Sequence, residues 1–398
     1  MSWDYVTLDK LGSISRGKSK HRPRNDKTLF GGKYPFIQTA DVKAAGLYLT
    51  EYTETYNDKG LAQSKLWPAG TLCITIAANI ADTTILGIDA CFPDSVMGFI
   101  PYEGVSNVKF VKYAFDILQR DCKKISQVTA QDNLSWKKLS TIKFPAPDIE
   151  IQDKIVSILS VYDDLIENNK KQIKLLEEAA QRLYKEWFVD LRFPGYEGTE
   201  IIDGVPEGWR KTTIGDTFNT VLGGTPSRSI STYWNGNIPW INSGEVNKLR
   251  IIKESEFITE LGLEKSSTKL MPLHTTVLAI TGATLGQVSY TEIETCANQS
   301  VVGIYDENEV YSIYLYLYVS NKIWHMIGKA TGGAQQHINK DIVDAYPIVL
   351  PERLIISKLN TLVEPYFDKM ANLYKQNSEL TEARDRLLPK LMSGEIEV

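Results

Sequence analysis

The chain of 398 residues contains two similar halves. When 204 is subtracted from residue numbers in the second half, the same residue type recurs in the first half at many positions. Such pairs include Pro35 and Pro239, Val42 and Val246, Pro68 and Pro272, Ile76 and Ile280, Pro147 and Pro351, Tyr162 and Tyr366, Lys171 and Lys375, and Arg182 and Arg386. Small insertions change the offset to 206 for Trp3 and Trp209 and to 205 for Cys91 and Cys296. Because a repeated sequence folds into repeated structural units, we expect two similar units, at about 1–206 and 207–398.

Each half has two parts with different patterns. In the first part, about 1–146 and 207–350, short apolar runs alternate with Gly, Pro, Asn and Asp, which predicts short strands, loops and a few helices. In the second part apolar residues recur in alternating steps of four and three, which predicts a long amphipathic helix. The seam positions are Ile155, Leu159, Tyr162, Ile166, Asn169, Ile173, Leu176, Ala180, Leu183 and Trp187, and, 204 residues later, Leu359, Val363, Tyr366, Met370, Leu373, Asn377, Leu380, Arg384, Leu387 and Leu391.

The two apolar seams have the same length, and neither is expected to stay exposed to water. The simplest partner for each helix is the other, so we expect an intramolecular antiparallel coiled coil. Each seam contains one Asn, Asn169 or Asn377, and a single polar residue in such a core typically fixes the register. The alternative is that each helix merely covers the globular part of its own half. The expected fold class is α+β, with two pseudo-symmetric α/β domains joined by two long antiparallel coiled-coil helices.

These patterns predict five segments. Residues 1–150 form the first globular domain, and residues 151–190 form the first helix. Residues 191–208 are rich in Gly, Pro and acidic residues without an apolar period, which is typical of a connector. Residues 209–352 form the second globular domain, and residues 353–398 form the second helix and a tail.

The formal net charge of −5 is unexpected for a protein that binds DNA, because Lys and Arg supply much of the affinity for phosphates. The charge is unevenly distributed, however. Between Arg16 and Lys27 the chain has six basic residues against Asp26 alone, whereas acidic residues gather at 148–178 and 252–264. An ordinary solvated loop can have the same composition, so the basic run alone leaves DNA binding open.

Composition also argues against several other classes of protein. No run approaches the ~18 to 20 apolar residues that span a bilayer, and the first ten residues lack a signal-like apolar core, so we expect a cytoplasmic protein without membrane contact. The four cysteines form no CxxC pair and the four histidines are dispersed, so we expect no metal site.

One catalytic motif matches by its letters. Residues 12–19, GSISRGKS, fit the phosphate-binding pattern GxxxxGK[ST]. The preceding LDKL is too polar for a buried strand, the following KHRPRNDK has no helical apolar period, and the related turn GGTPSRS at 223–229 has no lysine. We also find no methyltransferase motif, no nucleophile signature and no carboxylate cluster paired with a histidine. The sequence therefore predicts a protein without catalytic residues.

A series of motifs in the second half resembles the type I restriction-modification DNA specificity subunits. The motifs are the segment Trp209 to Asp216, GGTPS at 223–227, TYWNGNIPWINSGEV at 232–246, ITELGLEKSS at 258–267, LAITGATLG at 278–286 and CANQSVVGI at 296–304. The ends of the predicted helices, RLYKEWFVDLRFPG at 182–195 and RLLPKLMSGEIEV at 386–398, are also similar to that family. In the first half, YPFIQTADV at 34–42 keeps the shape of IPWINSGEV, whereas ITIAANIAD at 74–82 lacks the usual glycine pair.

This resemblance implies a function and a set of partners. Such subunits read a split double-stranded DNA target, with one half-site for each recognition domain, and bind two methyltransferase subunits through their helices. A translocating nuclease subunit joins them for restriction. The resemblance implies no cofactor in this chain, whereas S-adenosylmethionine, ATP and Mg would belong to the partner subunits.

Candidate contact residues are less well defined. Basic loops contact phosphates, and amide side chains on turns read base edges. The candidates for DNA contact are Lys18, Lys20, Arg22, Arg24, Gln131 and Asn133 in the first half, and Arg228, Gln335, Gln336 and His337 in the second. Plain turn chemistry is an alternative for the two polar loops. The candidates for partner contact are the seam aromatics Tyr162, Trp187 and Tyr366, together with Tyr374. We interpret Trp67, Trp136, Trp234, Trp240 and Trp324 as core or partner-facing residues rather than base-stacking ones.

Two other classes of function remain as alternatives. A coiled-coil scaffold without DNA affinity would explain the heptads but would leave two α/β domains without a role. A nucleotide-dependent enzyme would depend on the GSISRGKS match alone.

Overall fold

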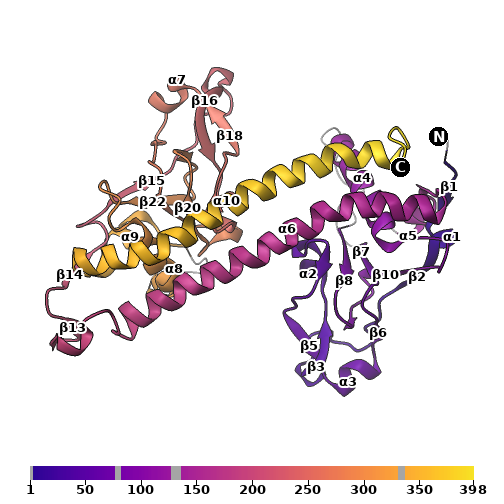
Figure 1. The fold of residues 1–398 in the computed structure, drawn as a ribbon, viewed down its shortest axis with the longest axis horizontal. Helices are drawn as coiled ribbons and strands as arrows, with labels where there is room; N and C mark the ends of the chain where they lie inside the picture. Colours follow the sequence, from indigo (N-terminus) through magenta and orange to yellow (C-terminus); the bar gives the residue numbers. More distant parts are fainter. Residues whose placement is uncertain (1–2, 77–81, 127–135, 330–336) are drawn as a thin grey trace. The chain divides into compact units, whose positions relative to one another are not determined.

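The computed structural model describes residues 3–76, 82–126, 136–329 and 337–398, which fold into two compact units (Figure 1). Unit 1 contains Met1–Asn168 and Asn377–Val398, and unit 2 contains Asn169–Gln376. Helices α6 (Ile149–Tyr184) and α10 (Arg353–Met392) each contribute a segment to both units.

The core of unit 1 is a five-stranded sheet with strand order β2-β10-β7-β8-β4. Neighbouring strands are antiparallel except β4 and β8, which are parallel. Because successive side chains of a strand point to opposite faces, Leu72 and Ile74 of β7 join the apolar cluster of α4 (Val108–Ser126), whereas Cys73 joins the cluster of Val42 on the other face. The strands are β2 (Gly12–Arg16), β4 (Tyr48–Leu49), β7 (Leu72–Thr75), β8 (Thr83–Leu86) and β10 (Val96–Pro101).

A second sheet of unit 1 has the order β5-β3-β9-β6, and a separate ladder pairs β1 with β11. The β3–β5 ladder shifts register between Phe30 and Tyr34. The strands are β1 (Tyr5–Thr7), β3 (Phe30–Phe36), β5 (Glu54–Tyr56), β6 (Leu66–Trp67), β9 (Ala90–Cys91) and β11 (Lys143–Pro145). The helices are α1 (Leu8–Leu11), α2 (Thr39–Ala44), α3 (Asp58–Ala62), α4 (Val108–Ser126) and α5 (Trp136–Leu139).

Unit 2 repeats this topology with one difference: an isolated bridge between Met271 and Thr295 stands where unit 1 has the β6–β9 ladder. Its five-stranded sheet has the order β15-β22-β19-β20-β17, and its second sheet has the order β18-β16-β21. The β16–β18 ladder shifts register between Trp234 and Ile238, which is 204 residues after the shift in unit 1. The duplication predicted from the sequence is therefore confirmed down to the position of an irregularity in one ladder.

Most elements of unit 2 follow their counterparts in unit 1 at offsets close to 204. The strands are β12 (Ile201–Ile202), β13 (Val205–Pro206), β14 (Arg210–Thr213), β15 (Asn219–Leu222), β16 (Trp234–Ile241), β17 (Arg250–Ile251), β18 (Glu256–Ile258), β19 (Thr276–Ala279), β20 (Val288–Thr291), β21 (Cys296–Ala297), β22 (Val301–Tyr305) and β23 (Pro347–Leu350). The helices are α7 (Glu260–Glu264), α8 (Ser312–Lys329) and α9 (Lys340–Asp344). Helices α8, α9 and α10 begin 204 residues after α4, α5 and α6.

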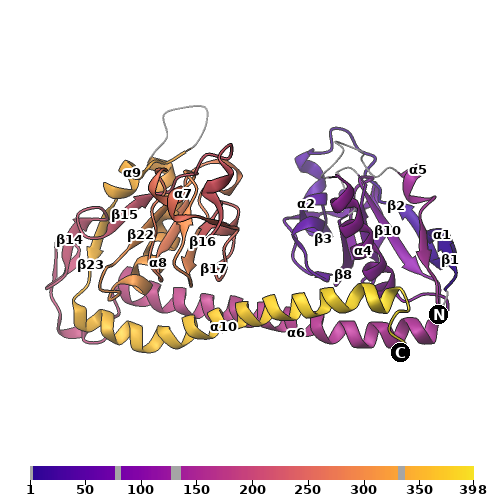
Figure 2. The same ribbon diagram turned by 90° about the horizontal axis from the view of Figure 1, so that it is seen from above.

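Segments of α6 and α10 pack together within each unit. In unit 1, Ile155 and Leu159 of α6 share a core with Leu388 of α10 and with α4. In unit 2, Ile173 of α6 shares a core with Met370 of α10 and with α8. Early residues of α6 thus pack with late residues of α10, and later residues of α6 pack with earlier residues of α10, which is the antiparallel order. Every predicted seam position is buried or half-buried. Figure 2 shows the strands of each unit on one side of its segments of these helices.

The charged residue in the predicted seam, Arg384, has a specific partner in unit 1. Its Nη1 donates to Oδ1 of Asp163 at 2.5 Å, and the Tyr113 hydroxyl donates to the other carboxylate oxygen at 2.5 Å. Asp163 is 4% exposed. The corresponding residues of unit 2, at the offset of 204, are Ala180 and Phe367, which are apolar and buried. The same crossing is therefore polar in one unit and apolar in the other.

Unit 2 has a buried charge cluster of its own. Arg250 of β17 is fully buried, 3.6 Å from carboxylates of both Glu177 of α6 and Glu292. Its guanidinium carbon lies 4.0 Å from the ring centre of Phe367. Burial raises the pKa of Glu292. The cluster ties α6 to the sheet of unit 2 by a contact that aliphatic packing alone would not provide.

The connector has more structure than we expected. Strands β12 and β13 form a two-stranded hairpin in unit 2. The ring centres of Phe193 and Trp209 lie 4.9 Å apart. Before it, Lys185–Val189 form a π-helical turn that ends α6.

Candidate nucleic-acid interface

The basic loop of unit 1 follows β2 and is held by backbone contacts. Gly17 donates to the Val96 carbonyl at 2.8 Å, and Lys18 donates to the Phe92 carbonyl at 2.9 Å. A side chain at Gly17 would collide with the Pro93 carbonyl oxygen, since a Cβ there would lie 2.3 Å from it. The Ser64 hydroxyl also donates to the Lys18 carbonyl at 2.7 Å. The loop is therefore a fixed platform for its side chains.

The cationic side chains of this loop differ in their surroundings. Lys18 is half-buried, whereas Lys20, Arg22 and Arg24 are exposed. Arg22 donates to the backbone carbonyls of Ser19 and His21 at 2.7 and 2.8 Å. Arg24 pairs with Asp94 at 2.6 Å. These exposed cations make a surface that can approach phosphates.

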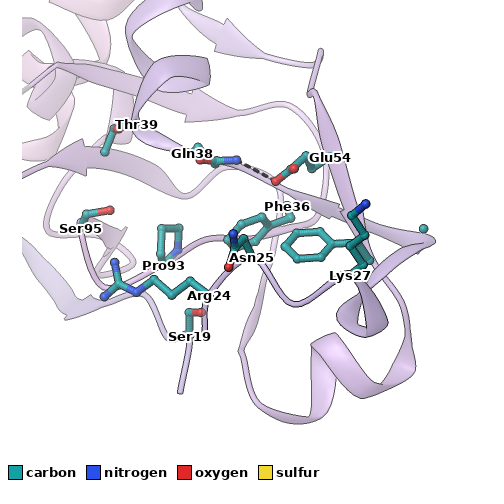
Figure 3. A pocket seen from close by; sticks show the side chains of 12 residues that line it. Ser19, Arg24, Asn25, Lys27, Phe36, Gln38, Thr39, Glu54, Pro93 and Ser95 are labelled. Atoms are coloured by element: carbon teal, nitrogen blue, oxygen red, sulfur yellow. Dashed lines mark hydrogen bonds between the residues drawn. The ribbon is translucent and has the colours of Figure 1, made fainter. Parts of the chain in front are cut away.

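The loop also forms one wall of a pocket of about 700 Å³. Phe30 and Phe36 of β3 line it together with several polar side chains (Figure 3). The exposed side chains of Gln38 and Glu54 lie opposite Arg24 and meet through a hydrogen bond of 2.7 Å from Nε2 to Oε2. The other lining residues are Ser19, Asn25, Lys27, Gly31, Thr39, Pro93 and Ser95.

The corresponding place in unit 2 is occupied by Arg228. Its guanidinium donates two hydrogen bonds to Glu256, at 2.5 and 2.8 Å, and its central carbon lies 3.6 Å from the ring centre of Trp234. The bonds from Arg228 lower the pKa of the Glu256 carboxyl. The exposed Arg228 is therefore held by an ion pair and a ring, whereas Arg24 points to Asp94.

The other predicted DNA contacts are located only in part. Gln131, Asn133, Gln335 and Gln336 lie outside the described residues. His337 is exposed and directly precedes Ile338, whose backbone N–H donates to the Ile280 carbonyl at 3.1 Å. This bond places His337 next to the turn that follows β19.

The stretch that matches the phosphate-binding pattern has a different structure from such a loop. Residues 12–16 form strand β2, which pairs antiparallel with β10. Residues 17–26 contain no helix, and the next helical turn is the 3₁₀ turn Lys27–Leu29. A phosphate loop needs backbone amides at the start of a helix, so the rejection of this motif agrees with the structure.

The four predicted partner-contact residues are mostly covered in the structure. Trp187 is buried, and Tyr162 and Tyr366 are half-buried. Tyr374 is half-buried, and its hydroxyl accepts a hydrogen bond from the Leu249 N–H at 3.3 Å. Their partner roles stay predictions.

A second apolar stripe on α6 was missed by the sequence analysis. Ile158, Val161 and Leu165 are exposed, Val161 by 56%, in steps of three and four residues, so they share one helix face. The stripe is visible in the sequence, but the stronger heptad seam beside it concealed it.

The tryptophans also divide into two groups. Trp67, Trp234 and Trp240 are buried, whereas Trp324 of α8 is 69% exposed. The side chain of Trp136 lies outside the described residues.

Among the described residues, no group of three His, Cys, Asp or Glu side chains is arranged to hold a metal ion. The described helices include none that is both long and apolar enough to cross a membrane.

Comparisons with known proteins give the family. The sequence matches the type I restriction modification DNA specificity domain twice, over residues 2–178 and 206–374. The chain belongs to this family. The two matches fall on the two halves of the duplication, as expected for a specificity protein with two recognition domains.

Full-length relatives and a solved structure agree with the specificity family. The chain is 27% identical to the type I restriction enzyme MjaIX specificity subunit of Methanocaldococcus jannaschii, over 100% of this chain and 94% of the relative. It is 26% identical to the HindI specificity subunit of Haemophilus influenzae, over 97% and 98%. The fold is similar to a crystal structure of the type I restriction-modification S subunit from M. genitalium, with a TM-score of 0.53 and 16% identity over 98% and 96% of the two chains.

Proposed function

We propose that this chain is the non-catalytic, DNA-reading specificity subunit of a type I restriction-modification enzyme. Unit 1 and unit 2 each contact one half-site of a bipartite double-stranded target. One observation carries this proposal: the same strand topology occurs twice, with different polar side chains at equivalent positions around β3 and β16. A repeated scaffold with different contact residues reads two different half-sites, so the target is asymmetric.

Within this proposal, residues 1–150 and 209–352 are the recognition domains. Residues 151–190 and 353–398 act as spacer helices, and residues 191–208 connect them. Because α6 and α10 each run through both units, they suit a spacer that sets the separation of half-sites, about one DNA turn or ~34 Å. The predicted DNA contacts are those named above in the two halves, with Lys20, Arg22 and Arg24 on phosphates.

The partners follow from the same assignment. Two methyltransferase subunits dock on the helices, and restriction subunits join the complex in the cytoplasm. The exposed stripe of Ile158, Val161 and Leu165 supports docking on α6, because three apolar side chains on one face favour burial against a partner. S-adenosylmethionine, ATP and Mg belong to those partners. Methylation requires the target base to be flipped out, so the recognition domains hold the flanking duplex while the partner acts.

The test is selection of DNA by the purified complex of this chain with its methyltransferase subunits. Random-sequence duplexes are bound at several salt concentrations, and the retained DNA is sequenced. We expect two different short blocks separated by a constant number of unread bases. Enrichment of one block, or of none, would contradict the proposal.

A further inference from the structure

The pocket of unit 1 differs from its counterpart in unit 2 in one respect that concerns recognition. In unit 2 the arginine of the loop, Arg228, donates two hydrogen bonds to Glu256, the counterpart of Glu54. In unit 1 the equivalent arginine, Arg24, takes Asp94 instead, and Glu54 bonds to Gln38. The pocket in unit 1 is therefore bordered by a carboxylate, Glu54, that forms no ion pair with a cation among the described residues.

The residues around the arginine explain this difference. Asp94 aligns with Gln299 at the offset of 205, and a neutral amide attracts a guanidinium less than a carboxylate does. In unit 2, Thr225 donates to Gln299 at 2.5 Å, so Glu256 is the acid that remains for Arg228.

The side-chain amide of Asn242, the counterpart of Gln38, has hydrogen-bond partners within unit 2 for both its oxygen and its nitrogen. Its Oδ1 accepts from the Gly244 N–H at 2.7 Å, and its Nδ2 donates to the Ser255 hydroxyl at 3.1 Å. Gln38 and Glu54, in contrast, are both exposed, and their mutual bond uses one N–H of the amide and one oxygen of the carboxylate. The amide oxygen of Gln38 accepts from the backbone N–H of Asp41 at the start of α2, so the second carboxylate oxygen and the second amide N–H remain for a ligand.

The charge of Glu54 decides what that ligand is. A carboxylate repels phosphate, so beside a basic loop that contacts the DNA backbone it is suited to a hydrogen-bond donor instead. In the major groove the donors on base edges are the amino groups of adenine (N6) and cytosine (N4), and Glu and Gln are side chains that meet them.

We propose that Glu54, positioned by Gln38, reads the amino group of one adenine or cytosine in the half-site bound by unit 1. This inference rests on the proposed function. Arg24, held by Asp94, borders the same pocket, and Lys20 and Arg22 contact the adjoining phosphates. In unit 2 the counterpart carboxylate, Glu256, is already paired with Arg228, so this mode of reading is specific to one half-site.

The test compares the wild-type complex with complexes containing Glu54→Gln, Gln38→Ala or the control Glu103→Gln. Glu103 is an exposed glutamate in the turn after β10, so the control removes the same charge elsewhere in unit 1. The readout is relative binding of duplexes that carry each of the four base pairs at every position of the selected target. Because an amide can still accept from an amino group but can also donate to guanine O6 or thymine O4, Glu54→Gln is expected to reduce the preference for an amino-bearing over a carbonyl-bearing base at one position of one half-site by about tenfold or more. The preferred base of the wild type at that position distinguishes adenine from cytosine.

The outcomes separate the two proposals. If the wild type selects a bipartite target and both Glu54→Gln and Gln38→Ala leave every position unchanged, the reading role of Glu54 is wrong while the proposed function stands. Gln38→Ala keeps the backbone N–H that donates to Asp41, so it tests the pocket even if Glu54→Gln folds poorly. If the wild type selects no bipartite target, the proposed function itself fails.

Discussion

The polar contact between α6 and α10 in unit 1 can be tested by replacing Asp163 with Leu. Asp163 is buried and accepts from both Tyr113 and Arg384, each at 2.5 Å. The change would leave a buried hydroxyl and a guanidinium without this acceptor. Breaking a buried ion pair from one side costs roughly 3–5 kcal/mol. Because the Arg384 side chain is 23% exposed and also bonds to Asp385, we expect the lower end, about 3 kcal/mol.

The duplication supplies a second variant for the same test. The double change Asp163→Phe with Arg384→Ala installs the residues that unit 2 has at the equivalent crossing, Phe367 and Ala180. Replacing a whole buried ion pair by apolar residues is often neutral or stabilising. The double variant should therefore regain about 2 kcal/mol of what the single variant loses.

The assay is urea unfolding of the full chain, with the midpoint and slope compared between variants. Arg386→Ala is a matched control, since Arg386 forms an exposed pair with Glu382 on the same helix, and such pairs contribute less than about 1 kcal/mol. A loss below about 1 kcal/mol for Asp163→Leu, or a double variant as unstable as the single one, would refute the reasoning.

Three further predictions follow from other contacts. Changing Lys20, Arg22 and Arg24 together to Ala should weaken binding of the complex at every DNA sequence and reduce the slope of log K against log salt by about 2 to 3; an unchanged slope would exclude this loop from phosphate contact. Arg250→Met should cost about 3 kcal/mol near pH 7, because Glu177 and Glu292 lose their cation. Burial raises the pKa of Glu292 in the folded protein, so the charged carboxylate opposes folding as the pH rises above the ordinary value of 4.5. The stability that Arg250→Met loses relative to the wild type, measured from urea midpoints, should therefore shrink below that pH. A stability loss that does not depend on pH would contradict this prediction. Val161→Glu with Leu165→Glu should abolish co-purification of the methyltransferase subunit, whereas Arg182→Glu, an exposed position farther along α6, should retain it; equal recovery from all variants would place the docking surface elsewhere.

Much of the fold could be predicted because the two halves share one pattern. The offset of 204 predicted two similar units, and the steps of four and three predicted which faces of the two long helices are covered. The basic run was found from charge alone, and two of its exposed cations, Arg24 and Lys27, line the pocket.

The pocket itself could not be predicted. Gln38 and Glu54 are separated by sixteen residues, and neither stands out in composition. The hairpin of β12 and β13 within the connector was missed because its strands have two residues each, too short for a period to appear.

Repetition and periodicity are local properties, since side chains three or four apart share a helix face whatever surrounds them. For this reason the amino-acid sequence alone was enough to infer two equivalent units and two long helices with one buried face each. The choice of partner for each charge depends on segments distant in the chain. Arg24 faces an Asp and Arg228 a Glu, and Arg384 in a seam finds Asp163, because folding brings together carboxylates that lie 70, 28 and 221 residues away. These ion pairs, rather than the arginines themselves, distinguish the two halves.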